Sequence, residues 1–476
     1  MKKTKVIATI GPASKDENVL KALISNGMDI ARINMTHSDY QFAEDIIKKI
    51  RKIDKELNKN TGILIDLKGP DIIVNTFEGG TAYFNTGDKI RIYDDPCLVG
   101  DSTKFSVSYN NFVRDVKTNT TIKLNDGLIE LLVLEKGVDY LLCEVKVGGF
   151  IEDHKGVNVI NRKLNVPFLS KKDKEDILFA DRIEADFLAL SFVSNYEDVL
   201  EVYDHLIDIK NDRLAIIAKI ENESAVEDLD NIISNSDGIM IARGDLGVEL
   251  PMERVPGIQK KIINKCHMEG KFSIVATEMM SSMENTNRPT RAEVSDVANA
   301  ILDGIDVVML SGETTIGKYP VETLETMVKI IEQTEKEVDY YKFIDQAMRT
   351  ENEDITGTIA YSVVMSADKM KAKLIMTPTM TGYTAKKISR FRPSCPIIAL
   401  SPDEKTIKNL NIYYGVYPIL ISKITTFDKI LEKINEVAKS YDLVKDDKYI
   451  ITGGYPFNDV KKTNFMKIEE MRWLDV

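Results

Sequence analysis

The most constraining feature of this sequence is a short apolar run followed by a stretch of helical periodicity, repeated eight times. Most runs are rich in β-branched residues and apolar on both faces, as parallel strands covered on both sides are. The stretches between them carry apolar residues at helical spacing, as at Phe42, Ile46, Ile50, Ile53 and Leu57. Eight such alternations predict an α/β fold, a closed TIM (β/α)8 barrel. The runs are 5–11, 28–34, 62–69, 187–193, 214–222, 238–245, 272–279 and 307–313.

The third repeat is interrupted. Its strand ends near Gly69, but the amphipathic helix expected next spans 171–185, which is far beyond a usual loop. The residues between carry strand and turn signals without a convincing helix. They predict an inserted all-β lid domain over 70–164. The barrel segments 1–69 and 165–335 together come close to the roughly 250 residues of a typical barrel.

The strand and helix rhythm restarts after residue 335. Apolar runs at KLIMTPT, PIIALS, VYPILI and KYIITGG are separated by helical stretches, the longest over 426–441. This pattern predicts a separate C-terminal α/β domain over 336–476.

Charge and cysteine usage exclude several classes of protein. The net charge is −12 and the 63 lysines and arginines are scattered, which argues against nucleic acid as the main partner. The four cysteines have no ligand-like spacing, so they are expected to be free thiols of a reducing compartment. No run has membrane-spanning length, and the first apolar run is too short for a signal peptide. We therefore expect a cytoplasmic protein with no membrane partner.

Charged residues collect where the predicted strands end, the active-site face of this architecture. Glu221 and Asp245, at adjacent strand ends, suit one hard cation with oxygen ligands. Lys219 lies on the same rim because side chains alternate along a strand, and with Arg32 it makes a pocket for an anion. Residues 243–247 predict a tight glycine turn whose amides approach a carboxylate or phosphate. A plain Lys219–Glu221 ion pair is the alternative, but convergence of several strands favours the metal-and-anion site.

Nine segments, in order along the chain, resemble the pyruvate kinase family. The Lys-Ile-Glu and Ala-Arg-Gly-Asp-Leu-Gly motifs are the most specific of them. The resemblance implies phosphoryl transfer from phosphoenolpyruvate to ADP, giving pyruvate and ATP in the final step of glycolysis. It also implies a homotetramer. The segments are 4–14, 27–39, 67–72, 124–128, 218–222, 240–251, 276–280, 287–304 and 309–320.

The resemblance also implies roles for individual residues. Glu221 and Asp245 would hold Mg²⁺ or Mn²⁺, and Lys219 would stabilise charge on the phosphoryl group and the enolate. Arg32 would contact phosphate, and Thr277 would lie on the route that protonates the enolate. Two further sets are implied. The substrate carboxylate would lie against Arg243, Gly244, Asp245 and Thr277, and the nucleotide would face Asn34, His37 and Lys172.

Four positions depart from the family pattern: Leu67, Asp71, Ile73 and Ile316. Ile73 removes an arginine expected to meet phosphate, and Ile316 stands where a lysine is common. Members that do without K⁺ tend to carry a lysine at the Asp71 position. Because no such charge is present here, we predict that K⁺ stimulates activity. Its expected ligands are Asn34, Thr36, Asp66 and Leu67.

The segment 377–387 is a loop that enters a helix, a plausible site for a phosphorylated effector. An ordinary turn with capping threonines is an equal alternative. The residues concerned are Thr377, Thr379, Thr381, Gly382 and Thr384.

Two other functions compete with this one. A dikinase would need a phosphohistidine domain, and none of the four histidines has such a context. The lost cations at Ile73 and Ile316 motivate a catalytically impaired regulatory or scaffold homologue, but the retained Lys219 and metal pair argue against it.

Overall fold

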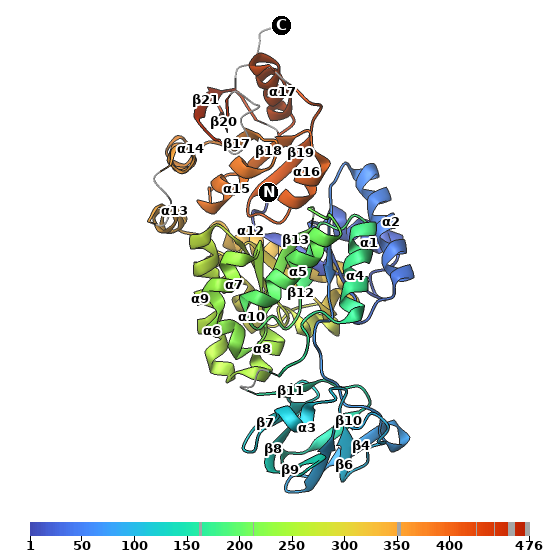
Figure 1. Ribbon diagram of the computed structural model, residues 1–476. Helices are drawn as coiled ribbons and strands as arrows, with labels where there is room; N and C mark the ends of the chain where they lie inside the picture. The colour runs from blue at the N-terminus through green and yellow to red at the C-terminus, as the bar shows by residue number, and fades with distance from the viewer. Residues whose placement is uncertain are drawn as a thin grey trace.

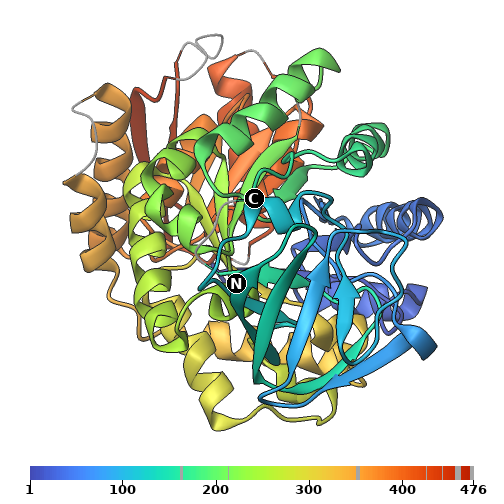
Figure 2. The same ribbon diagram turned by 60° about the horizontal axis from the view of Figure 1, so that its bottom comes forward.

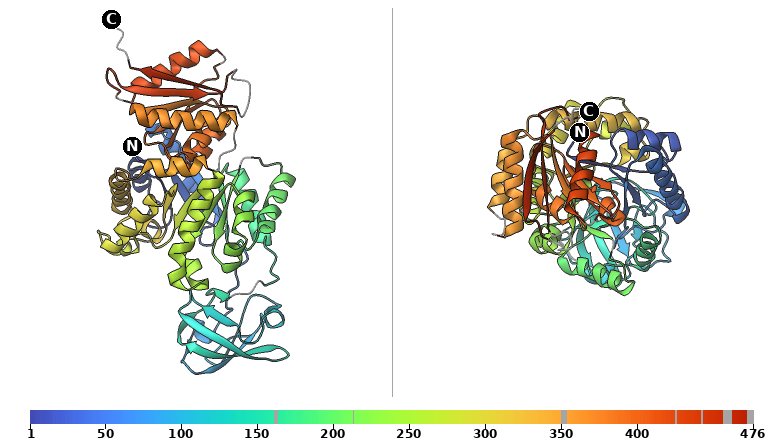
Figure 3. Two further views of the ribbon diagram at one scale, coloured as in Figure 1. Left: turned by 90° about the vertical axis from the view of Figure 1, so that its left-hand side faces the viewer. Right: turned by 90° about the horizontal axis from the view of Figure 1, so that it is seen from above.

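The computed structural model describes residues 1–160, 164–212, 214–349, 354–424, 426–441, 443–455 and 462–471. It has three tiers, with the barrel in the middle, the inserted domain at one end and the C-terminal domain at the other (Figure 1). The long axis is clearest in the left view of Figure 3. None of the helices in the described part of the chain combines the length and the apolar composition that crossing a bilayer requires.

Eight parallel strands close the barrel in the order β1-β16-β15-β14-β13-β12-β3-β2, which confirms the predicted TIM fold. Their register places the last residues of neighbouring strands side by side, for example Asn34 beside Asp66. The strands are β1 Lys5–Thr9, β2 Ile30–Asn34, β3 Gly62–Asp66, β12 Phe187–Leu190, β13 Ala215–Ile220, β14 Gly238–Ala242, β15 Phe272–Ala276 and β16 Val307–Leu310.

Amphipathic helices cover the barrel from outside. In α2 the Asp39 side chain accepts the Phe42 amide at 2.7 Å and begins the helix. Ile46, Ile50 and Ile53 are then buried at helical spacing. The helices are α1 Glu17–Ser25, α2 Tyr40–Leu57, α4 Lys171–Arg182, α5 Tyr196–Asp208, α6 Glu223–Glu227, α7 Leu229–Asn235, α8 Arg243–Glu249, α9 Val255–Glu269, α10 Arg291–Leu302, α11 Gly312–Thr315 and α12 Pro320–Thr334.

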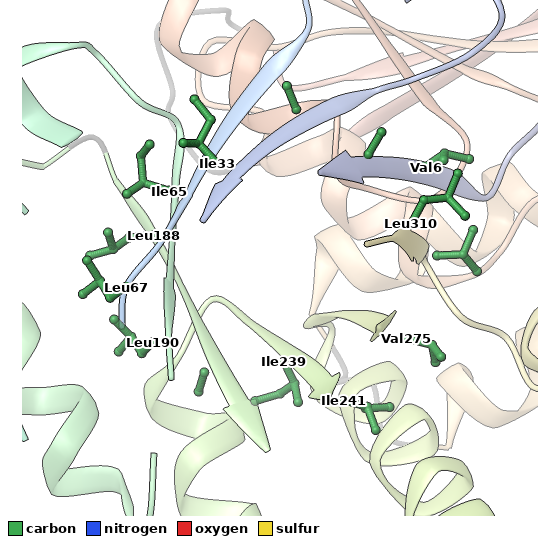
Figure 4. Close-up of a cluster of buried hydrophobic side chains, with 14 of the residues drawn as sticks. Val6, Ile33, Ile65, Leu67, Leu188, Leu190, Ile239, Ile241, Val275 and Leu310 are labelled. Atoms are coloured by element: carbon green, nitrogen blue, oxygen red, sulfur yellow. The ribbon is translucent and has the colours of Figure 1, made fainter. Parts of the chain in front are cut away.

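Two apolar layers follow from the alternation along the strands. Outward side chains such as Ile33, Leu188 and Ile239 pack under the helices (Figure 4). Inward side chains fill the lumen, where Gly238 makes room for Phe272, whose ring a Cβ would approach to 2.1 Å. The lumen cluster runs on into the C-terminal domain, and the rings of Phe272 and Tyr413 meet edge to face at 5.4 Å.

In its described residues the inserted domain is all-β apart from the short 3-10 segment Glu78–Gly80 and the short helix α3 (Phe112–Asp115), which the sequence did not predict. It has its own apolar core around Phe84, Phe105 and Phe112, and it lies at the end of the barrel that comes forward in Figure 2. Its elements are β4 Thr81–Phe84, β5 Lys89–Tyr93, β6 Lys104–Ser106, α3 Phe112–Asp115, β7 Thr121–Leu124, β8 Ile129–Lys136, β9 Tyr140–Val147, β10 Gly149–Glu152 and β11 Val157–Val159.

The C-terminal domain is a five-stranded sheet in the order β19-β18-β17-β20-β21, parallel except for the last pair. It meets the amino ends of the barrel strands, because Lys5 donates to the Val416 carbonyl at 2.6 Å. Its elements are α13 Tyr340–Met348, α14 Ile355–Met370, β17 Leu374–Pro378, α15 Tyr383–Arg390, β18 Ile397–Ser401, α16 Glu404–Leu410, β19 Val416–Leu420, α17 Phe427–Lys439, β20 Lys448–Gly453 and β21 Phe465–Glu470.

Candidate active site

A buried charge cluster lies at the carboxyl ends of β2, β3 and β13, facing the inserted domain. Lys219 contacts Glu221 at 2.8 Å and Asp66 at 3.6 Å. Arg32 binds the other oxygen of Asp66 through Nε and a terminal nitrogen, both at 2.7 Å. Four charged groups from three strands therefore share one buried network, which places Arg32, Asp66, Lys219 and Glu221 together as the sequence predicted.

The two acids of this network differ in their environment. Burial disfavours the charge on Asp66, but Lys219 and Arg32 outweigh it and hold the pKa of this carboxyl below its usual range. At Glu221, burial dominates, Lys219 opposes it and Asp245 adds to it, and together they raise the pKa to about 7. The backbone amide of Phe192 donates to Glu221 at 2.5 Å. Asp66 is thus a charged carboxylate held by cations, whereas Glu221 needs additional positive charge.

Lys219 remains a cation in this environment. Burial favours its neutral form, but Asp66 and Glu221 more than offset this and raise the pKa above the ordinary lysine value. The ammonium also donates to Ser191 at 2.7 Å. A buried, oriented positive charge is therefore available at the centre of the site.

Asp245 lies on α8, so the tight glycine turn predicted over 243–247 is wrong. β14 ends at Ala242, and Arg243 is already the first residue of the helix. No side chain of the preceding residues caps α8. The Gly244 amide instead donates to the Thr277 hydroxyl at 2.8 Å, so a neighbouring strand end supplies the partner that a local turn would have supplied.

Thr277 follows β15 directly and is half-buried beside α8. Its hydroxyl donates to the Ala276 carbonyl at 2.7 Å in addition to accepting the Gly244 amide. The Thr277 hydroxyl therefore lies against the Gly244 amide, with Asp245 the next residue of α8. The carboxylate site expected there stays a prediction. The Arg243 side chain is directed instead to Asp296 and to the carbonyl of Thr277, at 2.6 and 2.8 Å.

The predicted nucleotide-facing residues lie at the rim. His37 is exposed, and Asn34 is half-buried with its side-chain oxygen accepting the Thr36 amide at 3.0 Å. Lys172 lies in the first turn of α4, where it pairs with the buried Asp176 and donates to the Tyr40 hydroxyl at 2.8 Å. Lys172 is thus held beside the start of α2.

The residues predicted for K⁺ present a set of oxygen atoms at the ends of β2 and β3. The Asn34 side chain and Asp66 lie in adjacent strands. Leu67 offers only its carbonyl, which accepts from Ser191 at 2.8 Å, because its side chain is buried in the outer apolar layer (Figure 4). Thr36 is exposed.

The inserted domain contacts α8 directly. Lys123 donates to the Val248 carbonyl at 2.6 Å, and Asn158 donates to the Glu249 carboxylate at 2.9 Å. Asp126 of the inserted domain acts electrostatically on Asp71, as Glu221 does from the barrel. The inserted domain therefore faces the charged end of the barrel and touches the helix that carries Asp245.

Two of the departures lie apart from the charge cluster. Ile73 forms a bridge with Gly156 at the start of the inserted domain, and its amide donates to Ser108 at 3.1 Å. Ile316 follows α11 and is 67% exposed. Neither replaces a residue of the network around Lys219.

The predicted effector loop lines a hollow of the C-terminal domain. Thr379, Thr381 and Thr384 line it together with apolar residues such as Leu400 and Ile421. Thr377 is fully buried with no hydrogen-bond partner in the described structure, while Thr379 accepts the Gly382 amide at 3.0 Å. Thr379 therefore acts as a turn cap, as the alternative expected.

Two residues of the network were missed from the sequence. Ser191 connects Lys219 to the Leu67 carbonyl, and Thr9 accepts from Arg32 at 3.0 Å. Both are polar residues at or just after a strand end in otherwise apolar runs, so the signal was present in the ends of the first and fourth strands.

Comparisons with known proteins agree with this geometry. The family model described as "Pyruvate kinase, barrel domain" matches residues 1–324, and "Pyruvate kinase, alpha/beta domain" matches 357–469. A pyruvate kinase of Clostridium perfringens is 41% identical over 99% of this chain and 100% of its own length. That of Sporosarcina psychrophila is 42% identical over 98% of this chain and 80% of its own.

A solved structure is also similar. The crystal structure of a pyruvate kinase from Cryptosporidium parvum has a TM-score of 0.93, with 36% identity over 98% of this chain and 96% of that chain. Agreement in both family models, in full-length relatives and in three-dimensional structure leads to one conclusion: this chain is a member of the pyruvate kinase family, a kinase that transfers a phosphoryl group.

Proposed function

We propose that this chain transfers the phosphoryl group of phosphoenolpyruvate to ADP, giving pyruvate and ATP. The observation that carries the proposal is the buried network of Lys219, Glu221, Asp66 and Arg32 at the mouth of the barrel. Its charges suit a reaction that proceeds by positioning and charge neutralisation and needs little covalent chemistry from the protein. The names of the family and its relatives point to the same reaction.

Glu221 and Asp245 fit a divalent cation, Mg²⁺ or Mn²⁺. Asp245 and burial both disfavour the charge on Glu221, and a cation between the two carboxylates relieves this. No third acid, histidine or cysteine joins them in the described residues, so coordination positions are left for substrate oxygens and water. The bound cation supplies charge neutralisation at the phosphoryl oxygens.

The residues of the chain then divide the work. Arg32 and Lys219 bind the phosphoryl group, and Lys219 stabilises the charge that remains on the enolate oxygen. The Gly244 amide, now held by the Thr277 hydroxyl, turns to the substrate carboxylate. Thr277 lies on the route by which a proton from water reaches the enolate and converts it to pyruvate. Asn34, His37 and Lys172 face the nucleotide.

Monovalent cation binding is part of the proposal. The oxygens of Asn34, Asp66 and Leu67 are hard donors that suit K⁺. Asp66 and Glu221 already balance the charges of Arg32 and Lys219, so K⁺ would restore charge balance when an additional anion enters the site.

Three further expectations go with the family. The inserted domain acts as a lid, the chain assembles as a homotetramer, and the C-terminal hollow takes a phosphorylated effector. Its threonines and the adjoining start of α15 support the last of these. Its apolar lining favours a ligand that also carries an apolar group.

The decisive experiment measures pyruvate formation from phosphoenolpyruvate and ADP with Mg²⁺, for the wild type and for Lys219→Ala. Turnover in the wild type that is lost in a folded variant supports the proposal. A folded wild type that is inactive with every divalent and monovalent cation overturns it and leaves the regulatory or scaffold function.

A further inference from the structure

Two successive residues after β15 adopt a left-handed backbone conformation. The φ angles are 64° at Thr277 and 53° at Glu278. A β-branched residue rarely occupies this region, and it persists there only when its surroundings hold it. Something in the fold must therefore compensate for the conformation that places the Thr277 hydroxyl.

The compensation comes from the Arg243 side chain. Its Nε and one terminal nitrogen donate to the Thr277 carbonyl at 3.3 and 2.8 Å, and the same terminal nitrogen donates to the Glu278 carbonyl at 2.9 Å. The other terminal nitrogen is held by Asp296 of α10 at 2.6 Å. Only a planar guanidinium can make these contacts together, because a lysine offers one point charge.

The same contacts show that the Arg243 side chain is unsuited to binding substrate. Each of its three nitrogens already has a protein acceptor, and the side chain is 10% exposed. Its backbone, in contrast, leads directly to the Gly244 amide that donates to the Thr277 hydroxyl. The Arg243 side chain therefore binds the Thr277 carbonyl, while the amide of the next residue, Gly244, binds the Thr277 hydroxyl.

We propose that Arg243 is a positioning residue. Its guanidinium, anchored by Asp296, holds the left-handed Thr277–Glu278 segment so that the Thr277 hydroxyl stays at the start of α8, beside Asp245. The inference rests on the proposed function, in which Thr277 lies on the route that protonates the enolate. It assigns to the Arg243 side chain a role through Thr277, whereas the substrate contact expected from the sequence concerned the backbone amides of residues 243–245.

The kinetic test is a double-mutant cycle between Arg243→Lys and Thr277→Val. The valine keeps the branched shape and lacks the hydroxyl. Arg243→Lys lowers kcat by about 10- to 100-fold, since small misplacements of a reacting group have effects of this size, and KM for phosphoenolpyruvate changes by less than about threefold. In the Thr277→Val background the same lysine change lowers kcat by less than about twofold. Fold losses that multiply in the double variant, or a raised KM with unchanged kcat, overturn the proposal.

A second readout separates this inference from the proposed function. In hydrogen–deuterium exchange followed by mass spectrometry, Arg243→Lys speeds exchange in a peptide covering 272–284, whether or not the protein turns over phosphoenolpyruvate. Arg254→Lys is the matched control, because Arg254 pairs with Glu223 at 2.9 Å and, within the described residues, makes no hydrogen bond to Thr277 or Glu278. Unchanged exchange in Arg243→Lys, or equal acceleration in the control, refutes the positioning role. An inactive wild type with the expected exchange pattern would overturn the proposed function but not the positioning role of Arg243.

Discussion

The contact between Asn158 of the inserted domain and Glu249 of α8 offers a quantitative test of the proposal that the inserted domain closes over the barrel as a lid. Asn158 donates to the carboxylate at 2.9 Å, and Lys123 donates to the adjoining Val248 carbonyl. Burial raises the pKa of Glu249, while Asn158 and Lys123 lower it. Asn158→Ala removes one of these two latches and leaves the barrel network untouched.

The size of the effect follows from the charge of the acceptor. A hydrogen bond to a charged group contributes about 1.5–3 kcal/mol. In the open state water solvates Glu249 in either variant, so the Asn158→Ala change destabilises only the closed state. We take the loss of hydrogen-bond free energy as about 1.5 kcal/mol, which shifts the closed–open ratio by about tenfold. Asn158→Asp has a larger effect, since it places two carboxylates together.

The assay is a double-mutant cycle between Asn158→Ala and Glu249→Ala, with KM for phosphoenolpyruvate and small-angle scattering as readouts. We expect each single variant to raise KM and the radius of gyration, and the coupling free energy to be about 1.5 kcal/mol. Strictly additive effects, or an Asn158→Asp variant no worse than Asn158→Ala, would refute the latch.

Three further outcomes are expected. Lys219→Ala lowers kcat by about a thousandfold, because a unit charge about 4 Å from the reacting anion contributes about 4 kcal/mol at an effective dielectric constant of 20. Steady-state kinetics on a variant whose circular dichroism matches the wild type check this. Replacing K⁺ by tetramethylammonium lowers wild-type turnover, and equal rates in the two salts would contradict the assignment of Asn34 and Asp66. Burial lowers the pKa of His267, which contacts the Arg390 carbonyl, to about 3, so the unfolded chain binds the additional proton. The free energy of unfolding therefore falls by up to about 1.4 kcal/mol per pH unit below about 6.5, a slope that chemical denaturation should find reduced in His267→Gln.

The architecture was predictable because each barrel strand is recognisable from its own local sequence. Runs such as 187–193 and 238–245 are apolar on both faces, and a strand covered on both sides needs nothing else. The ends of these runs were less predictable. The predicted run 238–245 included Arg243 to Asp245, but these residues begin a helix. The partner that satisfies the Gly244 amide is Thr277, which is remote in sequence.

The site was predictable as a set of charges but not as a network. Alternation along β13 places Lys219 and Glu221 on one rim, so their proximity follows from local geometry. That Asp66 lies between Lys219 and Arg32 depends on the register of the closed barrel. The orientation of the Arg243 side chain depends on Asp296 in a later helix, and no local pattern reports such a contact.

The continuous core that joins the barrel lumen to the C-terminal domain makes the three tiers unequal as building blocks. The inserted domain has an apolar core of its own, so we expect that it can be grafted onto another member of the family or expressed alone. The barrel floor has no such independence, since Phe272 packs against Tyr413 and Lys5 is bonded to Val416. Recombination between relatives should therefore tolerate crossovers near residues 70 and 164 and fail near 336, unless the facing halves of the floor are exchanged together.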